Sequence, residues 1–382
     1  MVNLFTDCTV ETTQEMIKIM QENGQVVLCV GSSVNMLNTA IFLQSDCSVA
    51  VEPLLPQVCA KKPAIVQTRS EHILTPTQLA AALISIPCPM GFKLDDHIGA
   101  IHFIAEARSY LMAMRNCFYL MLCYHLAIML GQVVSSLLLF PPVLSSQHLL
   151  WLIFIIIPVL CVSLMGIPVD PRVMNNATSK NSDPINRDMV VQFLGYFVLR
   201  FIPAVFVCLF CYGLTLHSFC IKENMSTGAS VCTLYAFSDY NATETRFWYD
   251  KFSGGLIVAQ NVFLFLLVLY FVCISVSFVH WSDHLWQHVP FTNKFWSIVT
   301  PVLCISQIIF FACDVVLRNN SVRQSFSLSD IHPAVYAVGF CFPVIILVVN
   351  ELVKKHEVKL YVRYQKRTRL NFGTKLGMNS PF

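Results

Sequence analysis

Long apolar segments dominate the larger, carboxyl-terminal part of the chain. Six of them reach about 20 residues, the length that crosses roughly 30 Å of bilayer hydrocarbon. They cover residues 116–140, 148–167, 189–219, 255–279, 295–313 and 334–353. Because a helix satisfies its own backbone hydrogen bonds in lipid, this pattern predicts a mainly α fold, with a six-helix transmembrane bundle over residues 116–353.

The first 94 residues show shorter apolar runs. Val26–Val30 stops at Gly31, a helix-like segment follows, and a second run covers Cys47–Val51. Strand, tight turn, helix and strand form the unit with which α/β proteins hold a phosphate or a metal at a strand's carboxyl end. We therefore predict a cytosolic, partial α/β domain over residues 1–94, with residues 95–115 extending the first span on the cytosolic side.

The turn of this unit is the first candidate site. It contains Gly31, Ser32, Ser33, Asn35 and Met36. Asp residues would be needed there for phosphate chemistry, and the turn has none. The simpler interpretation is an ordinary βαβ piece in which Ser33 caps the helix.

A divergent insert precedes the first span. Residues 73–92 are apolar but contain three prolines, which makes them too interrupted for a predicted span. A re-entrant or interfacial segment is the alternative for this stretch.

Composition agrees with a membrane protein. The chain is 55% hydrophobic and only 12% charged, with a mean hydropathy of +0.62. Soluble domains carry about 25% charged residues. The lipid bilayer is therefore the expected partner, and no nucleic-acid interface is expected because no nucleic-acid-binding motif stands out.

The charge pattern predicts the orientation. The tail, residues 354–382, carries many basic residues and a single acid, Glu357. The positive-inside rule places such a tail in the cytosol. Six spans then return the amino terminus to the cytosol as well, in agreement with a start that lacks a basic, apolar signal peptide. The tail is typical of a topology anchor, and attraction to anionic lipid is the alternative.

Three glycosylation acceptors lie in the predicted luminal loops: Asn224, Asn241 and Asn319. A fourth acceptor tripeptide, at Asn176, falls on a predicted cytosolic loop and is expected to stay unmodified. Cys220 and Cys232 share a predicted luminal loop, where they either bridge or remain two thiols.

Polar residues inside the predicted spans are the candidates for a transport path. Arg200 is either paired or snorkels to the cytosolic face. His125, Gln132, Gln260 and Asn261 either line a path or tie helices together.

Two acids near span ends complete this set. Asp314, at a predicted luminal end, is expected to be solvated. Glu351 is expected to pair with a nearby lysine such as Lys354 or Lys355.

The middle of the chain carries a family resemblance. DDHIGAIHFIAEARSYLMAMR, a long span, a turn with two prolines, and HLLW leading to MGIPVDPRVM resemble the P-type cation-pump family. The opening LFTDCTVETTQEMIKIMQENGQVVLCVGSSVNMLN is similar to the pump segment that ends in a Gly-Asp-Gly-x-Asn-Asp loop. The resemblance implies the end of a phosphorylation domain followed by the fifth to tenth membrane helices.

The chain departs from this family at the positions that carry chemistry. Ser32 and Met36 stand where the family's two Mg²⁺-binding Asp residues would be, and Ile128 stands where a membrane carboxylate would be. The predicted sixth helix offers only the backbone carbonyls that Pro158 frees. Mg²⁺ requires hard, usually anionic oxygen ligands. The family's nucleophile and dephosphorylation motifs are also missing from this sequence, so we do not expect this chain to hydrolyse ATP.

The resemblance implies divalent cation transport, with magnesium as the ion and the endoplasmic reticulum membrane as the location. A catalytically inactive pseudo-pump, acting as a scaffold or accessory subunit of another transporter, is the alternative. Because the sequence starts inside a domain, we expect a fragment or a short isoform. No cofactor is expected in this chain, and ATP would bind only if an upstream half exists.

Overall fold

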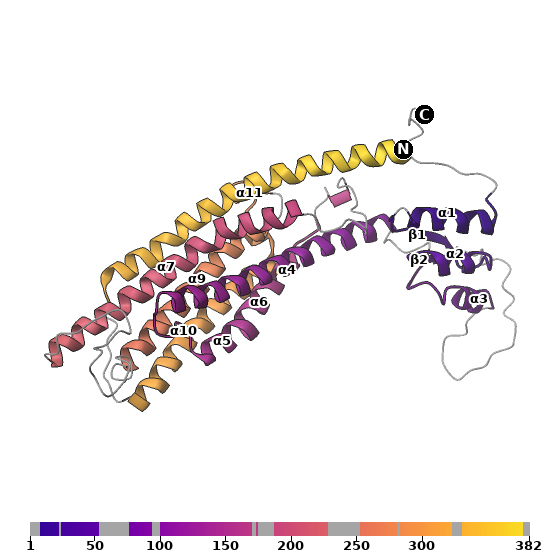
Figure 1. Cartoon of the computed structure of the whole chain (residues 1–382). Coiled ribbons are helices and arrows are strands. Elements are labelled where there is room, and N and C mark those ends of the chain that lie inside the picture. Colours follow the sequence, from indigo (N-terminus) through magenta and orange to yellow (C-terminus); the bar gives the residue numbers. More distant parts are fainter. Residues whose placement is uncertain are drawn as a thin grey trace, which may run out of the picture. The chain divides into compact units, whose positions relative to one another are not determined.

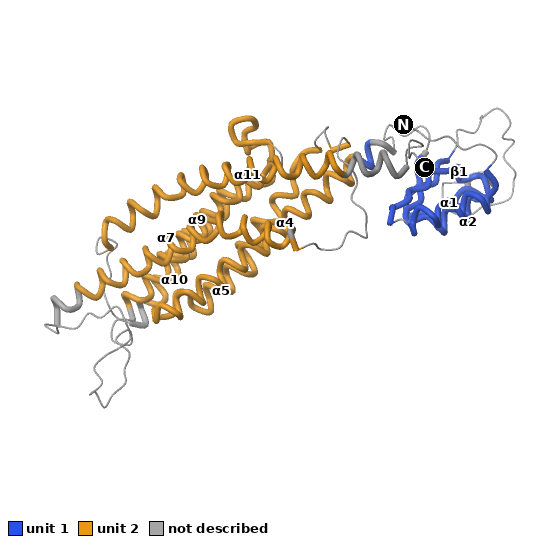
Figure 2. The backbone as a smooth tube through the Cα atoms, turned by 45° about the horizontal axis from the view of Figure 1, so that its top comes forward, with its two compact units in different colours: residues 1–104, 177–185 blue, residues 105–176, 186–382 orange. Residues whose placement is uncertain are grey.

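The computed structural model describes residues 8–22, 24–52, 76–93, 100–169, 173–174, 187–227, 253–280, 283–322 and 331–376. The chain divides into two compact units, coloured separately in Figure 2. The first comprises residues 1–104 and 177–185, and the second comprises residues 105–176 and 186–382.

The first unit contains a three-stranded parallel sheet in the order β1-β2-β3. Its strands are β1 (Leu28–Ser32), β2 (Cys47–Glu52) and β3 (Met90–Lys93). Its helices are α1 (Val10–Glu22), α2 (Asn38–Gln44) and α3 (Pro76–Ile84). The expected strand, turn, helix and strand are present, because β1 pairs with β2 in parallel and α2 connects them.

The third strand lies in the segment that the sequence left ambiguous. β3 pairs in parallel with β2, with Val49 opposite Met90. Pro76 begins α3, and the Pro87 carbonyl accepts a hydrogen bond of 3.2 Å from Ser48 Oγ. The prolines therefore lie at the start of α3 and in the connection between α3 and β3. Residues 90–92 pair with β2 in the sheet, which contradicts the re-entrant alternative for that part of the segment, and the interfacial alternative stays a prediction.

The second unit is a bundle of long apolar helices (Figure 1). They are α4 (Ala100–Leu137, in this unit from Ala105 onward), α5 (Ser146–Trp151), α6 (Ile157–Ser163), α7 (Arg187–Thr227), α9 (Ser253–Phe278), α10 (Lys294–Val322) and α11 (Pro333–Leu376). A π-helical turn, Leu152–Ile156, joins α5 to α6, and a 3-10 turn, Leu164–Gly166, follows. Six candidate membrane spans result, so the six-helix fold class is confirmed within the described residues.

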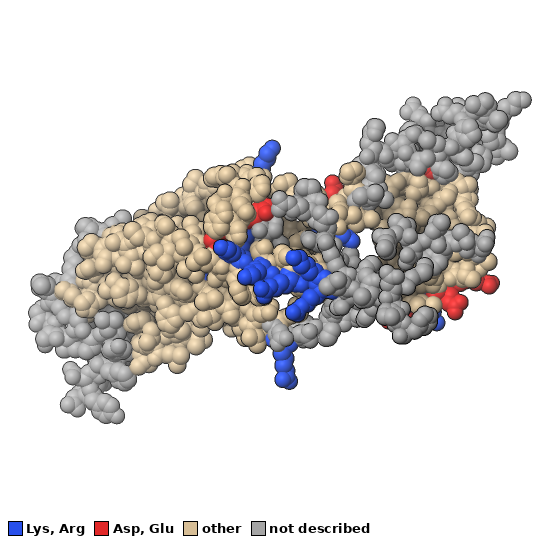
Figure 3. Space-filling model, turned by 90° about the horizontal axis from the view of Figure 1, so that it is seen from above, with Lys and Arg blue, Asp and Glu red and all other residues tan. Residues whose placement is uncertain are grey.

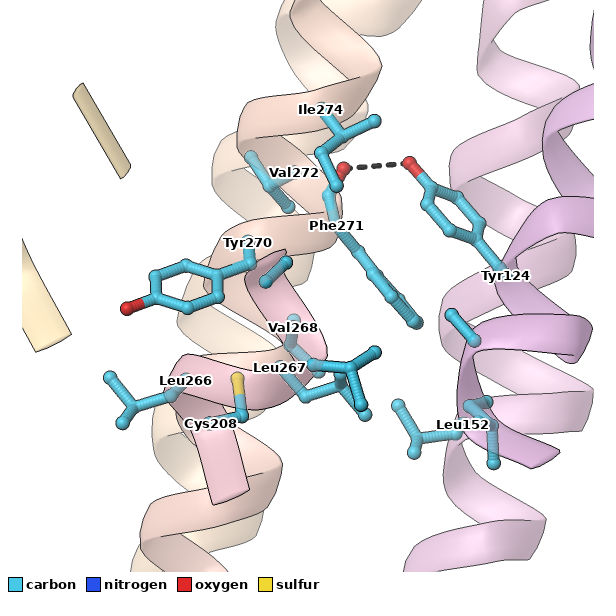
Figure 4. Close-up of a cluster of buried hydrophobic side chains, with 14 of the residues drawn as sticks. Tyr124, Leu152, Cys208, Leu266, Leu267, Val268, Tyr270, Phe271, Val272 and Ile274 are labelled. Atoms are coloured by element: carbon cyan, nitrogen blue, oxygen red, sulfur yellow. Dashed lines mark hydrogen bonds between the residues drawn. The ribbon is translucent and has the colours of Figure 1, made fainter. Parts of the chain in front are cut away.

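Helix α9 forms the centre of the bundle. Its most apolar stretch is 78% buried, against 17% for that of α10, and it packs against α7, α10 and α11. Tyr124 of α4 stacks on Phe271 of α9 with ring centroids 4.2 Å apart, and its hydroxyl donates to the Phe271 carbonyl at 2.6 Å (Figure 4). A helix buried on all sides reads as apolar all round, which matches the sequence of α9.

Candidate functional site

The turn after β1 satisfies its own polar groups. Ser32 Oγ accepts from the Val34 amide at 3.3 Å, and Asn35 Oδ1 accepts from the Leu37 amide at 3.1 Å. Met36 is 79% exposed. The side chains of the turn therefore offer neutral oxygens that already bond to the local backbone, together with a soft thioether, and this set is poorly suited to Mg²⁺.

Ser33 does not cap the following helix, which corrects the sequence interpretation. Helix α2 begins at Asn38, and no side chain caps it. Ser33 is buried, and its hydroxyl and amide both donate to the Val51 carbonyl, at 3.2 and 2.9 Å. The backbone stays extended through the turn's first residues, so Ser33 extends the β1–β2 pairing.

Gly31 and Asn38 fix the close approach of α2 to the turn. A Cβ at Gly31 would lie 3.1 Å from both Asn38 Nδ2 and the Phe42 ring. Asn38 Nδ2 in turn donates to the Ser32 carbonyl at 3.0 Å. These contacts hold the turn against α2, so its polar groups serve the local structure.

The thiol beside this turn is not an activated nucleophile. Burial raises the pKa of Cys29 on β1 above its ordinary value, and the nearby Asp46 carboxylate acts in the same direction. A hydrogen bond with Ser45 lowers the pKa, by less than burial raises it but by more than the Asp46 carboxylate does. Since the thiolate is the reactive form, Cys29 remains a protonated strand residue at neutral pH.

The two candidates on α4 do not form a polar path. His125 Nδ1 lies 2.7 Å from the Met121 carbonyl, one turn back on the same helix. Gln132 lines a space together with Ile128, Gly131 and Phe263, and this space leaves no room for a water molecule. The structure does not bring His125 together with the candidates on α9.

Gln260 and Asn261 do belong to one polar cluster, which we call the Asp314 network. Asp314 Oδ2 accepts from Asn261 Nδ2 at 2.6 Å, lies 3.1 Å from His148 Nε2, and accepts from Arg318 at 3.4 Å. Gln260 bonds Arg318 at 3.2 Å and donates to the Pro142 carbonyl at 2.7 Å. The network therefore joins α5, α9, α10 and the turn after α4.

Asp314 is 6% exposed, so the expectation of a solvated carboxylate is wrong. Three helices surround it, and sequence position alone could not show that. His148 was missed as well, although a lone His opening the HLLW segment and the i, i+4 pair Asp314–Arg318 were visible signals. His148 Nδ1 and Asn261 Oδ1 are buried and have no partner among the described residues.

A second contact between α5 and α10 lies near this network. Trp151 Nε1 donates to Gln307 Oε1 at 2.9 Å. The Trp151 ring stacks on Phe310 with centroids 4.6 Å apart. Here too the polar groups tie helices together.

Arg200 is paired and buried. Its guanidinium donates to Glu357 on α11 at 2.6 Å and lies 4.9 Å from the centroid of the Phe278 ring. Arg200 is 3% exposed, so of the two sequence alternatives the structure supports pairing. A short bond to a carboxylate and contact with an aromatic face stabilise a buried cation near the membrane boundary.

Glu351 does not pair with a lysine, which is a further correction. Glu351 Oε2 lies 3.2 Å from His284 Nδ1 and accepts from the Leu285 amide at 3.4 Å. Lys354 Nζ instead donates to the carbonyls of Ser277 and Asp283, at 3.0 and 2.7 Å. The last turn of α9 and the loop after it supply the partners at this position of α11.

The remaining sequence candidates lie at or beyond the helix ends. Asn224 and Asn319 fall in the final turns of α7 and α10, whereas Asn241 and Asn176 lie outside the described residues. Cys220 is disulfide-bonded, and Cys232 lies outside the described residues. Among the residues that the structure describes, no group of three His, Cys, Asp or Glu side chains could hold a metal ion.

Comparison with known proteins decides the family. Residues 141–356 match the family described as cation transporting ATPase, C-terminus. The chain belongs to this family. The matched region begins in the turn after α4 and ends in α11, so it includes the whole Asp314 network.

Two curated relatives match the whole chain. It is 39% identical over 390 residues to transmembrane protein 94 of Homo sapiens and 38% identical over 388 residues to transmembrane protein 94 of Mus musculus. In both cases the match covers 100% of this chain and 28% of the relative. The chain therefore spans little more than a quarter of the length of these relatives.

Proposed function

We propose that this chain is the carboxyl-terminal membrane region of a P-type ATPase-like protein that transports a divalent cation, magnesium, across the endoplasmic reticulum membrane. The observation that carries the proposal is the family match over residues 141–356, which coincides with the apolar bundle from α5 into α11. The ion and the membrane come from the sequence resemblance and belong to the proposal.

Within that protein, we propose that the described bundle acts as a frame, meaning that it gives structural support and does not by itself form the ion-binding site. His125 bonds its own helix, and Gln132 faces a space without room for water. Asp314 is paired with His148, and Arg200 is paired with Glu357. Mg²⁺ needs several hard oxygen ligands or its own waters, so its binding site would be completed by parts of a longer protein.

A second candidate function is a pseudo-pump that serves as a scaffold or accessory subunit of another transporter. The specific observation in its favour is the turn after β1. Ser32 and Met36 replace acids there, and Ser32 Oγ and Asn35 Oδ1 accept hydrogen bonds from the local backbone. A turn of this kind gives shape to the domain without phosphoryl-transfer chemistry, which needs a metal and an activated carboxylate.

Magnesium flux into vesicles separates these functions. The natural full-length protein, purified and reconstituted into vesicles that contain a magnesium-sensitive dye, should move Mg²⁺ if the protein is a transporter. A purified protein without flux, whose loss from cells nevertheless lowers magnesium uptake by the endoplasmic reticulum, would support the scaffold function.

A pair of double variants tests the frame. In His125→Leu with Gln132→Leu, flux should stay within about twofold of the natural protein, because neither side chain reaches a water-accessible path. Met129→Leu with Val133→Leu is the matched control, since both of these α4 residues are exposed on the bundle surface. Loss of flux in the first variant alone would place a path through α4 and overturn the frame.

A glycosidase assay tests the orientation. Glycans are expected on Asn224, Asn241 or Asn319 and not on Asn176. A glycan on Asn176 would reverse the proposed topology and remove both termini from the cytosol.

A further inference from the structure

Helix α11 continues far beyond the apolar part of its sequence. It runs for 44 residues, from Pro333 to Leu376. At 1.5 Å per residue its length is about 66 Å, roughly twice the thickness of bilayer hydrocarbon. The apolar run ends at Val353, and basic residues begin at the next position. The second half of α11 therefore starts at the boundary between hydrocarbon and headgroups.

One face of this second half packs against the bundle. Lys354 Nζ donates to the Ser277 carbonyl, and Glu357, three residues later, binds Arg200. Residues three and four apart share a helix face, so this spacing defines the inward side.

The opposite face is a row of cations, which we call the basic stripe: Lys355, Lys359, Arg363, Lys366 and Arg367. Its first three members follow one another at intervals of four residues, and all five side chains are exposed. Lysine and arginine side chains gather in one area of the surface in Figure 3. The stripe lies on the side of the helix away from Lys354 and Glu357.

The basic stripe has no counter-charge among the described residues. None of its five members forms a salt bridge there. The two acids of the same helix segment are engaged elsewhere, Glu351 with His284 and Glu357 with Arg200. A topology anchor requires only excess positive charge, whereas this charge is sorted onto one exposed face.

We propose that the basic stripe binds the headgroups of anionic phospholipids in the membrane that the bundle spans. Lys355 follows the apolar run by two residues, and Lys359 lies about 6 Å further along the axis. Both side chains lie within the headgroup layer, where a basic residue contributes about 1 kcal/mol of attraction to an anionic surface, or roughly fivefold in affinity. This binding is independent of the transport function proposed above.

The same geometry predicts a gradient along the stripe. Lys366 lies about 17 Å beyond Lys355 on the helix axis. Electrostatic attraction is screened over about 8 Å at physiological ionic strength. Lys366 and Arg367 should therefore contribute much less than Lys355 and Lys359, although all four carry the same charge.

Native mass spectrometry of the purified full chain can measure this gradient. The chain is released from detergent micelles that contain phosphatidylserine and phosphatidylcholine in equal amounts, and the bound lipids are counted. We expect preferential phosphatidylserine binding. Lys355→Gln with Lys359→Gln should weaken it about 25-fold, from two fivefold contributions. Lys366→Gln with Arg367→Gln, the matched control with the same loss of charge, should change it less than about threefold, because of screening.

Each other outcome is also decisive. Equal losses in the two double variants would show a response to net charge alone and would overturn headgroup contact by the stripe. Unchanged phosphatidylserine binding in both would overturn the proposal and leave an acidic protein segment as the partner to seek. All four positions are exposed, so the variants should fold, and an unchanged elution profile on size-exclusion chromatography verifies this.

Discussion

At one end of the bundle a single short acid, Asp314, collects donors from α5, α9 and its own helix, whereas at the other end two long cations, Arg200 and Lys354, reach out to acceptors. The aspartate side chain is short, with a single methylene group, so helix packing must bring its partners close to it. Arginine and lysine extend their stems along apolar surface to find a carboxylate or a helix-end carbonyl. The hydrogen bonds of the Asp314 network should therefore depend more strongly on the relative positions of the helices than those of Arg200 and Lys354 do.

Removal of the central acid should give the largest effect. In Asp314→Ala, buried donor hydrogens of His148 and Asn261 lose their acceptor, at about 1–3 kcal/mol each, so we expect roughly 3 kcal/mol of destabilisation. Asp314→Asn retains one acceptor oxygen and should cost about half as much. Unfolding in detergent, followed by circular dichroism, measures both. A loss below about 1 kcal/mol for Asp314→Ala would show that this end does not depend on the acid.

Breaking the ion pair at the cationic end comes next. Glu357→Leu leaves the Arg200 guanidinium without its carboxylate and should cost about 2 kcal/mol, the value of a hydrogen bond to a charged group. Adding Arg200→Met should restore most of the stability, because apolar replacement of a buried pair is often neutral. The same unfolding assay applies. A double variant less stable than Glu357→Leu would mean that Arg200 contributes chiefly through its aromatic contacts.

One substitution made at each end sharpens the comparison further. Trp151→Phe removes the hydrogen bond to Gln307 and should cost about 1 kcal/mol, because it leaves the Gln307 amide without its donor. Trp296→Phe removes the bond to Ser275, but Ser275 keeps its own bond to the Val272 carbonyl at 2.7 Å. Trp296→Phe should therefore have the smaller hydrogen-bond cost. Paired melting curves test the order, and a reversed order would assign the difference to packing of the indole rings.

The smallest effect is a pH dependence in the loop after α9. Burial lowers the pKa of His280 below its ordinary value, and the nearby Lys354 charge acts in the same direction, against a hydrogen bond with the Val289 carbonyl. Asp283 and His288 also lie near it, with opposing influences. The folded protein thus binds a proton less readily than the unfolded chain, so stability should fall as pH drops through the unfolded value near 6.5.

Melting temperatures at pH 7.5 and pH 5.5 check this dependence. His280→Gln should reduce the difference between the two temperatures, while the hydrogen-bonding contact with Thr292 can be kept by the amide. The prediction is wrong if the variant shows the same pH dependence as the natural chain.

Several structural features were visible in the sequence. Long apolar runs identified the six-helix bundle, because backbone hydrogen bonding in lipid permits few alternatives. A shorter strand–turn–helix–strand pattern identified the partial α/β unit. The third strand was missed, since residues 73–92 are apolar and rich in proline, and their pairing with β2 depends on a partner far away in sequence.

For the polar candidates, too, the sequence showed one part of the answer and the tertiary structure the other. Residue type alone showed that Ser32 and Met36 cannot replace carboxylates, and it left Arg200 open between pairing and snorkelling to the cytosolic face. Which partner each group has was decided by tertiary packing. Asn261 on α9 meets Asp314 on α10, and Gln260 meets Arg318. Glu357 in the predicted tail meets Arg200, and Ser33 bonds β2 and leaves α2 uncapped.

The sequence by itself determined that this chain spans the membrane and that the turn after β1 lacks acids. The first follows from the length of the apolar runs, and the second follows from the residue types in the turn. Only the tertiary structure decided that Asp314 is buried and that the cations Lys355 and Lys359 face away from the bundle. The physical reason is that burial and pairing depend on rotations of helices about one another. Those rotations are set by packing among residues more than a hundred positions apart, such as His148 and Asp314.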